Sequence, residues 1–212
     1  ALDEPAESPR SGVCTIRYQV AQDPGATLIE LEWEGARLGF PVRRLTPGMA
    51  CNAVLAIIAA LHLGVSADNI RRRFAHWRPA DLRGEIIEQG GRVVYLDCYN
   101  ANPASMLDAL DGFVALAPAS SPRLFVIGCM EELGTESASL HHALGASWPV
   151  RAGDRIVVFG LQGDAFASGL RSVHRYADVV VNPDREEIAA EIRASDRAVF
   201  VKGSRAYRLE EL

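Results

Sequence analysis

The sequence predicts an α/β fold whose larger, C-terminal part is a mostly parallel sheet with helices on both faces. From residue 92 onward, short strands rich in Val, Ile and Phe alternate with helical segments, which is typical of a parallel sheet covered on both sides. Before residue 80 the pattern differs, because alternating strands come first and two helices follow. We therefore expect a domain boundary within residues 76–81, which separates one part (1–79) from another (80–212).

The N-terminal part begins with three predicted strands. Residues 14–20 and 27–33 each place an apolar residue at every second position. Gly35 then marks a turn, and residues 38–42 form another short strand. This alternation predicts an antiparallel sheet with one buried and one solvated face.

Two helices are expected to complete the N-terminal part. From Asn52 to Leu61 apolar residues recur at helical spacing, and Gly64 stands where a helix of this length would end. Ser66 can cap a second helix, which must stop before Pro79 because the residue preceding a proline disfavours helical backbone.

The C-terminal part is predicted to contain five strands separated by helices. The strands are expected at residues 92–97, 124–128, 155–160, 179–181 and 198–202. The helices are expected at 103–117, after a cap at Thr135, around 165–170, and from Asn182-Pro183 onward. The helix at 103–117 has Leu107, Leu110 and Val114 on its apolar face. Because sheets of this kind bind ligands at the carboxyl ends of their strands, candidate site residues are sought there.

Composition excludes several classes of function. A net charge of −5 argues against a general nucleic-acid binder, and no run of about 18 apolar residues suggests a membrane span. The polar N-terminus lacks the apolar core of a signal peptide, which favours a cytoplasmic protein. The four widely spaced cysteines favour buried free thiols over disulfides or zinc ligands.

Familiar catalytic patterns are also missing. Neither G-x-x-x-x-G-K-[ST] nor G-x-G-x-x-G occurs, and the five histidines show no metal-ligand spacing. His141 could face the acidic residues 131–132, but we expect it on a helix surface. The sequence therefore predicts no metal site.

The first strand end with unusual chemistry follows residue 97. Asn102 as a cap and Pro103 in the first turn are explained by the helix that starts there. Capping does not explain Asp97, Tyr99 and Asn100. A carboxylate there can accept hydrogen bonds from a ribose diol, and an amide can bind a purine or a phosphate. A simple polar turn is the alternative.

Two further strand ends carry polar clusters. Residues 128–135, taken alone, favour a strand-to-helix loop with acids at the helix start. At residues 201–205, Lys202, Ser204 and Arg205 surround a glycine, and Lys202 is the only lysine in the chain. Such a group suits an anionic ligand, although a solvated turn with an ion pair is the alternative.

Four segments, in order along the chain, resemble motifs of the Mur ligase family of ATP-dependent peptide ligases. Residues 97–106, D-C-Y-N-A-N-P-A-S-M, resemble the D-S-Y-N-A-N-P-x-S-M of members that add D-alanyl-D-alanine. Residues 83–85 are similar to the G-R-G-E entry into the last domain, with Leu82 in place of the first glycine. Residues 128–134 resemble G-D-M-x-E-L-G, and residues 202–205 match K-G-S-R.

The resemblance implies a Rossmann-like C-terminal domain preceded by the tail of a central ATP-binding domain. It implies an ATP-dependent ligase that joins a UDP-N-acetylmuramoyl-tripeptide to D-alanyl-D-alanine in peptidoglycan synthesis. We expect this ligase to be a monomer. ATP and Mg²⁺ would be bound mainly by a preceding half, so this stretch alone would be inactive. By the family pattern, Asn52 lies near the adenine, while Arg83 and Asp97 reach the nucleotide. The residues that would face the substrates are Tyr99, Asn100, Asn102, Lys202, Ser204 and Arg205.

The sequence also departs from the family pattern. Where the family has G-x-H-N-x-x-N-A, residues 46–53 keep only the last two positions, with Gly48 and Met49 in place of His and Asn. Cys129 stands where the second motif has Asp. Two other interpretations stay open: a non-catalytic nucleotide-binding module, and a divergent or folylpolyglutamate-type ligase. Residues 99–103 argue against the folylpolyglutamate type.

Overall fold

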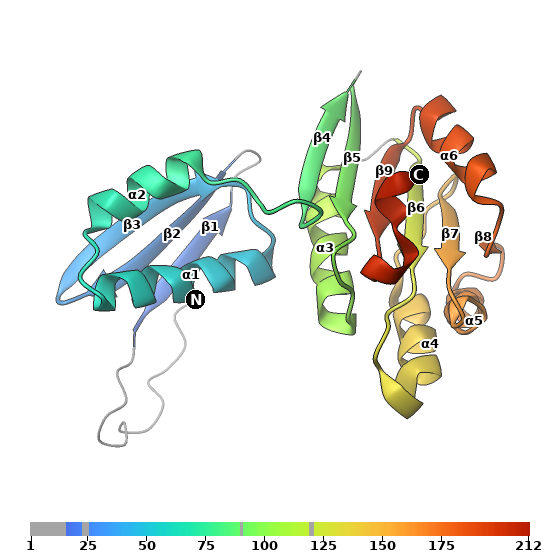
Figure 1. Cartoon of the computed structure of the whole chain (residues 1–212), viewed down its shortest axis with the longest axis horizontal. Helices are drawn as coiled ribbons and strands as arrows, with labels where there is room; N and C mark the ends of the chain where they lie inside the picture. Colours follow the sequence, from blue (N-terminus) through green and yellow to red (C-terminus); the bar gives the residue numbers. More distant parts are fainter. Residues whose placement is uncertain (1–15, 23–25, 90, 119–120) are drawn as a thin grey trace. The chain divides into compact units, whose positions relative to one another are not determined.

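The computed structural model describes residues 16–22, 26–89, 91–118 and 121–212, and the chain divides into two compact units between Trp77 and Arg78 (Figure 1). The first unit has an antiparallel sheet in the order β1-β2-β3. Its elements are β1 (Tyr18–Gln22), β2 (Ala26–Trp33), β3 (Ala36–Arg43), α1 (Pro47–His62) and α2 (Ala67–His76). The predicted antiparallel sheet is therefore confirmed, although positions 14 and 15 of its first strand lie outside the described residues.

The helix boundaries of the first unit follow from local capping. α1 begins five residues before the predicted Asn52, because the Thr46 side chain accepts a hydrogen bond from the Met49 amide at 3.2 Å. It ends as predicted, since Gly64 has a φ of +81° that suits glycine just past a helix. Ser66 caps α2 by accepting from the Asn69 amide, also as predicted.

The core of the first unit lies between its sheet and the helices α1 and α2, with Ile70 as the buried residue of α2. Alternate side chains of β2 and β3 pack against one face of α1, as the strand period requires. The buried side chains include Ile29, Leu31, Phe40, Val42, Val54 and Ile57. α1 has no Asp, Glu, Lys or Arg; Leu55 on its outer face and Leu63 directly after its end are 65% and 81% exposed. No helix in the described part of the chain is long and apolar enough to cross a membrane.

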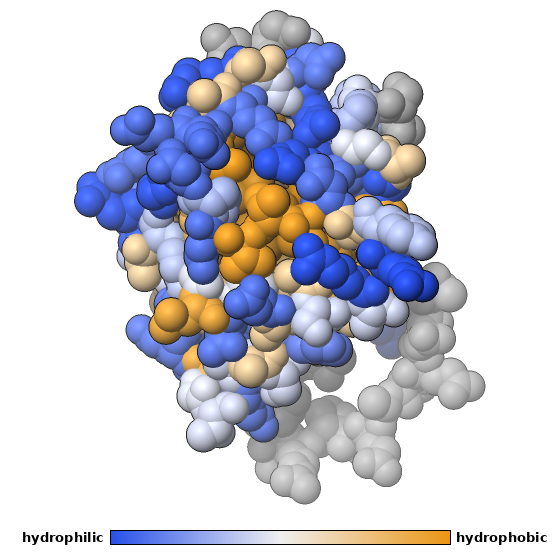
Figure 2. Space-filling view, turned by 90° about the vertical axis from the view of Figure 1, so that its right-hand side faces the viewer, coloured by the Kyte–Doolittle hydropathy of each residue, from blue (hydrophilic) through white to orange (hydrophobic). Residues whose placement is uncertain are grey.

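The second unit is a six-stranded sheet in the order β4-β5-β9-β6-β7-β8. Its strands are β4 (Glu85–Gln89), β5 (Arg92–Asp97), β6 (Arg123–Gly128), β7 (Arg155–Phe159), β8 (Asp178–Val181) and β9 (Ala198–Lys202). Five strands are parallel, and β4 pairs antiparallel with β5. β8 forms one edge; Figure 2, which looks at that side, shows apolar residues gathered at the centre of the face.

Helices cover both faces of this sheet, as predicted. Three of them, α3 (Pro103–Leu116), α4 (Ser137–Ser147) and α5 (Gly163–Val173), pack in one core, while α6 (Arg185–Ala194) packs in the other. Successive residues of β6 alternate between these cores: Phe125 and Ile127 belong to the first, Leu124 and Val126 to the second. The predicted α/β fold with a mostly parallel sheet is confirmed.

Some predicted helix details were wrong. α4 begins at Ser137 after a 3₁₀ turn (Gly134–Glu136), so Thr135 is not its cap. α6 begins at Arg185 behind an Asp184 cap rather than at Asn182-Pro183. Asn182 instead has a φ of +48° and bonds through its side chain to both backbone groups of Gly160.

The buried face of α3 also differs from the prediction. Leu110 is buried as expected, but Leu107 and Val114 are 41% and 40% exposed. The residues that enter the core are Met106, Ala109, Leu110 and Phe113. The contact face is therefore rotated by about one residue from the predicted face. β4 was not predicted at all.

Candidate functional site

Two predicted site residues meet at the carboxyl ends of neighbouring strands. β5 and β9 are neighbouring parallel strands (Figure 1). Asp97 ends β5, Lys202 ends β9, and the two residues are paired in the register of these strands. The Nζ atom of Lys202 lies 2.7 Å from Oδ2 of Asp97. The side chain of Lys202 is 1% exposed and that of Asp97 is 18% exposed. A lysine is rarely buried this completely unless it is paired, and here the carboxylate supplies the partner.

The turn between β5 and α3 is fixed from two sides. Lys202 Nζ also donates to the backbone oxygen of Asn100 at 3.1 Å. At the helix side, Asn102 and Ser105 form a capping box, with the Ser105 amide 2.8 Å from the Asn102 side chain. Asn102 is thus the predicted cap of α3, and its side chain is used for that purpose.

A second contact joins this turn to the segment that precedes β4. The guanidinium carbon of Arg83 lies 3.9 Å from the centre of the Tyr99 ring, and the Tyr99 amide donates to the Leu82 oxygen at 3.2 Å. Tyr99 remains 49% exposed. Arg83 and Tyr99, which were assigned to different ligands from the sequence, therefore lie against each other.

The turn after β9 contains the remaining predicted residues. A Cβ atom on Gly203 would lie 2.5 Å from the Cα atom of Gly128, so only glycine lets the ends of β9 and β6 approach this closely. Ser204 is buried and its hydroxyl accepts from the Ala206 amide at 3.4 Å. Arg205, whose side chain is 52% exposed, forms an ion pair with Glu210.

The loop after β6 is held by a histidine that we had expected on a helix surface. That expectation was wrong: His141 is buried, and its Nε2 atom accepts from the Met130 amide at 2.9 Å. Its Nδ1 atom lies 2.7 Å from the Ser137 oxygen. Because Nε2 is the acceptor, the proton must sit on Nδ1, and the neutral ring is the form that satisfies both contacts.

Residues near the C-terminus cover the carboxyl ends of β6 and β7. The Tyr207 ring packs on Gly128 and Gly160, and its hydroxyl bonds to the carboxylate of Glu131. Burial, and then this hydrogen bond, raise the pKa of the Tyr207 phenol above its usual value, so the phenol stays neutral. Arg185 of α6 anchors the segment by donating to the Tyr207 oxygen at 3.0 Å. Tyr207 and Arg185 lie outside the sequence motifs and were not predicted as site residues.

With the β6 and β7 ends covered, the β5 and β9 ends carry the candidate site. The structure brings Arg83, Asp97, Tyr99, Asn100 and Lys202 together through the contacts above. Among the described residues, none donates a hydrogen bond to Oδ1 of Asp97. Asn52 belongs to the first unit, where it is exposed on α1.

The three described cysteines are free thiols. Burial raises the pKa of the Cys98 thiol to about 12 and that of Cys129 to about 11, as expected for buried free thiols. Cys51 is exposed, contrary to the prediction, and Cys14 lies outside the described residues. The described residues include no cluster of His, Cys, Asp or Glu that could hold a metal ion.

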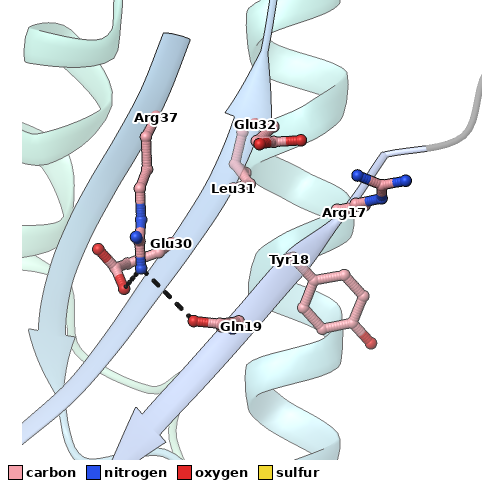
Figure 3. Close-up of a pocket in the computed structure, with 7 residues that line it drawn as sticks. All are labelled: Arg17, Tyr18, Gln19, Glu30, Leu31, Glu32 and Arg37. Atoms are coloured by element: carbon pink, nitrogen blue, oxygen red, sulfur yellow. Dashed lines mark hydrogen bonds and ion pairs between the residues drawn. The ribbon is translucent and has the colours of Figure 1, made fainter. Parts of the chain in front are cut away.

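A shallow hollow of about 160 Å³ lies elsewhere, on the three-stranded sheet of the first unit (Figure 3). Arg37 crosses it to form an ion pair with Glu30 at 2.7 Å and a longer contact with Gln19. Arg17, Tyr18, Leu31 and Glu32 complete its lining. None of these residues was a predicted site residue, and paired charges of this kind are typical of the solvated face of a sheet.

The second unit is a doubly wound α/β domain, and its candidate site lies at the carboxyl ends of two parallel strands, where such folds bind ligands. A family model, that of the Mur ligase glutamate ligase domain, matches residues 82–205. The chain belongs to the Mur ligase family.

Individual proteins are also similar to this chain, in sequence or in structure. The UDP-N-acetylmuramoyl-tripeptide–D-alanyl-D-alanine ligase of Treponema pallidum is 32% identical over 180 residues, which are 81% of this chain and 38% of the relative. MurF from Acinetobacter baumannii has a TM-score of 0.72 at 24% identity, over 91% of this chain and 42% of that structure. MurF ligase from Thermotoga maritima, in complex with ADP, has a TM-score of 0.70 at 20% identity, over 92% and 44%. The chain thus spans less than half the length of these proteins.

Proposed function

We propose that this chain is the C-terminal part of an ATP-dependent ligase that joins a UDP-N-acetylmuramoyl-tripeptide to D-alanyl-D-alanine. The observation that carries the proposal is the Asp97 and Lys202 pair at the ends of β5 and β9, inside the two motifs 97–106 and 202–205. The Treponema pallidum relative, named for this reaction, supports it. The setting would be peptidoglycan synthesis in the cytoplasm.

The site residues fit a nucleotide on chemical grounds. A carboxylate at the end of a parallel strand, with one oxygen to which no described residue donates, can accept hydrogen bonds from ribose hydroxyls. Arg83 would contact the nucleotide from the segment before β4, and Asn52 would lie near the adenine. The Thermotoga maritima protein, similar in fold, was solved with ADP, which supports a nucleotide as ligand.

The remaining predicted residues, apart from the buried Lys202, would lie on the side of the peptide substrates. Those with exposed groups are Tyr99, Asn100 and Arg205, whereas Asn102 and Ser204 use their side-chain oxygens as caps. ATP would supply the phosphoryl group that activates the tripeptide carboxylate for attack by the amine of D-alanyl-D-alanine. This chain would bind the nucleotide and keep water from the activated carboxylate, while Mg²⁺ and the phosphate loop would belong to the rest of the protein.

The direct test is a phosphate-release assay on the full-length protein. We expect inorganic phosphate only when ATP, UDP-N-acetylmuramoyl-tripeptide and D-alanyl-D-alanine are all present, together with a product heavier by the dipeptide residue mass. Bound ATP with no phosphate release under these conditions would instead favour a non-catalytic nucleotide-binding module. Phosphate release with a folate substrate and glutamate would favour the folylpolyglutamate type.

A further inference from the structure

Lys202 is enclosed in a way that does not suit a residue that touches a substrate. Its side chain is 1% exposed, and its ammonium donates to Asp97 Oδ2 at 2.7 Å and to the Asn100 oxygen at 3.1 Å. An ammonium has three N–H donors, and two of them are used by these protein groups. A ligand could reach the ammonium only after the turn that follows β5 had moved.

We infer that Lys202 is a positioning residue, which orients the Asp97 carboxylate toward the nucleotide and fixes the turn at residues 98–102. It acts on the reaction through Asp97 and does not contact the peptide substrates. The inference rests on the proposed function, because that proposal identifies the ligand of Asp97 as ATP.

The contacts explain how one buried cation can do this. Lys202 holds Oδ2 of Asp97, and no described residue donates to Oδ1, so the second oxygen is left to accept from a ligand. The carboxylate would otherwise rotate about its last bond and share its lone pairs with water. The positive charge also offsets the repulsion between Asp97 and the nucleotide phosphates.

A neighbouring cation shows the contrast. Arg205, three residues further along, has a side chain that is 52% exposed and forms an ion pair with Glu210, whose side chain is 16% exposed. It is the cation of this turn that an anionic ligand can approach directly. The two basic residues of the 202–205 motif therefore have different tasks.

The test is a double-mutant cycle in the full-length protein, with Lys202→Met, Asp97→Asn and the combined variant. The readouts are the Kd for ATP, from calorimetry, and the KM for D-alanyl-D-alanine. We expect each single substitution to weaken ATP binding about tenfold, in the range of a lost charge-assisted hydrogen bond. The combined variant should be no weaker than Asp97→Asn within about twofold, because coupled residues are not additive. The KM for D-alanyl-D-alanine should stay within about twofold.

A matched control distinguishes positioning from a general loss of stability. Arg123 and Asp154 form another buried ion pair, with side chains 2% and 0% exposed, at the amino ends of β6 and β7 in the same sheet. Arg123→Met should lower the unfolding temperature as Lys202→Met does, but leave the Kd for ATP unchanged. Equal losses of ATP affinity in both variants would overturn the inference.

The combined variant also tests the inference in the case that Lys202→Met does not fold. If Lys202→Met leaves Asp97 buried without a partner and does not fold, the combined variant, which removes both charges, should fold. Additive losses in the cycle, or a raised KM for D-alanyl-D-alanine in both backgrounds, contradict a positioning role. A wild-type protein that binds ATP but does not ligate overturns the proposed function alone, whereas one that binds no ATP overturns both.

Discussion

Leu82 has a left-handed backbone conformation, with a φ of +61°, at a position where the family motif has glycine. A residue with a Cβ atom pays roughly 1–2 kcal/mol for this conformation, and glycine does not. The conformation is needed because the Leu82 oxygen accepts the Tyr99 amide and the next residue, Arg83, lies on the Tyr99 ring. The strained residue thus supports a contact of the candidate site.

The strained backbone at position 82 predicts that glycine stabilises the protein more than alanine there, the reverse of the usual order in a helix. Leu82→Gly should be more stable than Leu82→Ala by about 1 kcal/mol, because these variants differ only in the Cβ atom that opposes a positive φ. Urea unfolding of both variants measures the difference. As a control, Ala190→Gly on the exposed face of α6 should lose about 1 kcal/mol, the ordinary cost of glycine in a helix. Equal stability of the Gly and Ala variants at position 82 would contradict the assigned conformation.

The three described cysteines should differ in reactivity. Cys51 is exposed, whereas Cys98 and Cys129 are buried. At pH 8 we expect iodoacetamide to modify Cys51 in the native protein and to leave Cys98 and Cys129 intact, since alkylation needs an accessible thiolate. Mass spectrometry of the peptides resolves each site, and unfolding in guanidinium should make all of them reactive. Rapid native modification of Cys98 would refute its burial.

The two buried thiols, Cys98 and Cys129, predict a loss of stability at alkaline pH. Their folded-state pKa values, about 11 for Cys129 and about 12 for Cys98, lie above the value of 9.0 for a free thiol. The unfolded chain therefore releases these protons first, and the stabilisation that is complete below about pH 9 is lost as the pH rises through 11 and 12. Urea midpoints at pH 8 and pH 11 measure the loss, which should be smaller in a Cys98→Ala/Cys129→Ala variant.

At the scale of elements, α4 and α5 pack backbone against backbone through two glycines. A Cβ atom on Gly169 would lie 1.9 Å from the His142 oxygen, and one on Gly145 would lie 2.1 Å from the Phe166 oxygen. Both oxygens belong to the backbone and cannot move aside as the end of a flexible side chain can, so the helices would have to separate. This close contact fixes how α4 and α5 cover the sheet.

Gly169→Ala should therefore destabilise the protein, although the same change normally favours a helix by about 1 kcal/mol. We expect a loss of about 3 kcal/mol or more, the upper range for overpacked sites. Urea unfolding measures it, and Ser168→Ala, at the exposed neighbouring position of α5, should be close to neutral. A neutral Gly169→Ala would mean that the helices are further apart.

The elements also show what the sequence could predict. The five parallel strands are short, apolar runs with clear ends, and all five were found. β4 was missed because only two of its five residues, E-I-I-E-Q, are apolar and because the strand lies at a sheet edge. The face of α3 was misplaced because Leu107 and Val114 have the same helical spacing as Met106 and Phe113. Only contact with the sheet decides between the two stripes.

The candidate site was predictable to the same extent. The sequence indicates parallel strands, and it follows that Asp97 and Lys202 lie at the same edge of the sheet, where the strands have their carboxyl ends. Their direct contact requires β9 to lie next to β5, more than 100 residues away in the chain, and local periodicity does not encode this strand order. The covering of β6 and β7 by Tyr207 depends on the same tertiary placement.

At the scale of the whole molecule, the division between Trp77 and Arg78 separates two independent cores. Both apolar clusters of the second unit, one on each face of its sheet, consist of residues from that unit. Its C-terminal segment is anchored within the unit as well, by Arg185 and by the packing of Leu209. We therefore propose that residues 78–212 form a domain that folds without the first unit.

Residues 78–212, expressed alone, should unfold in urea in one cooperative transition. Trp148 is the single tryptophan of this part and is completely buried, so its fluorescence should be that of an enclosed indole and should shift to the red on unfolding. The Gly169→Ala substitution should lower the midpoint by the same amount in the isolated domain and in the whole chain, because the α4 and α5 contact lies within the domain. A solvent-exposed emission spectrum without a transition would show that the second unit depends on the first for its fold.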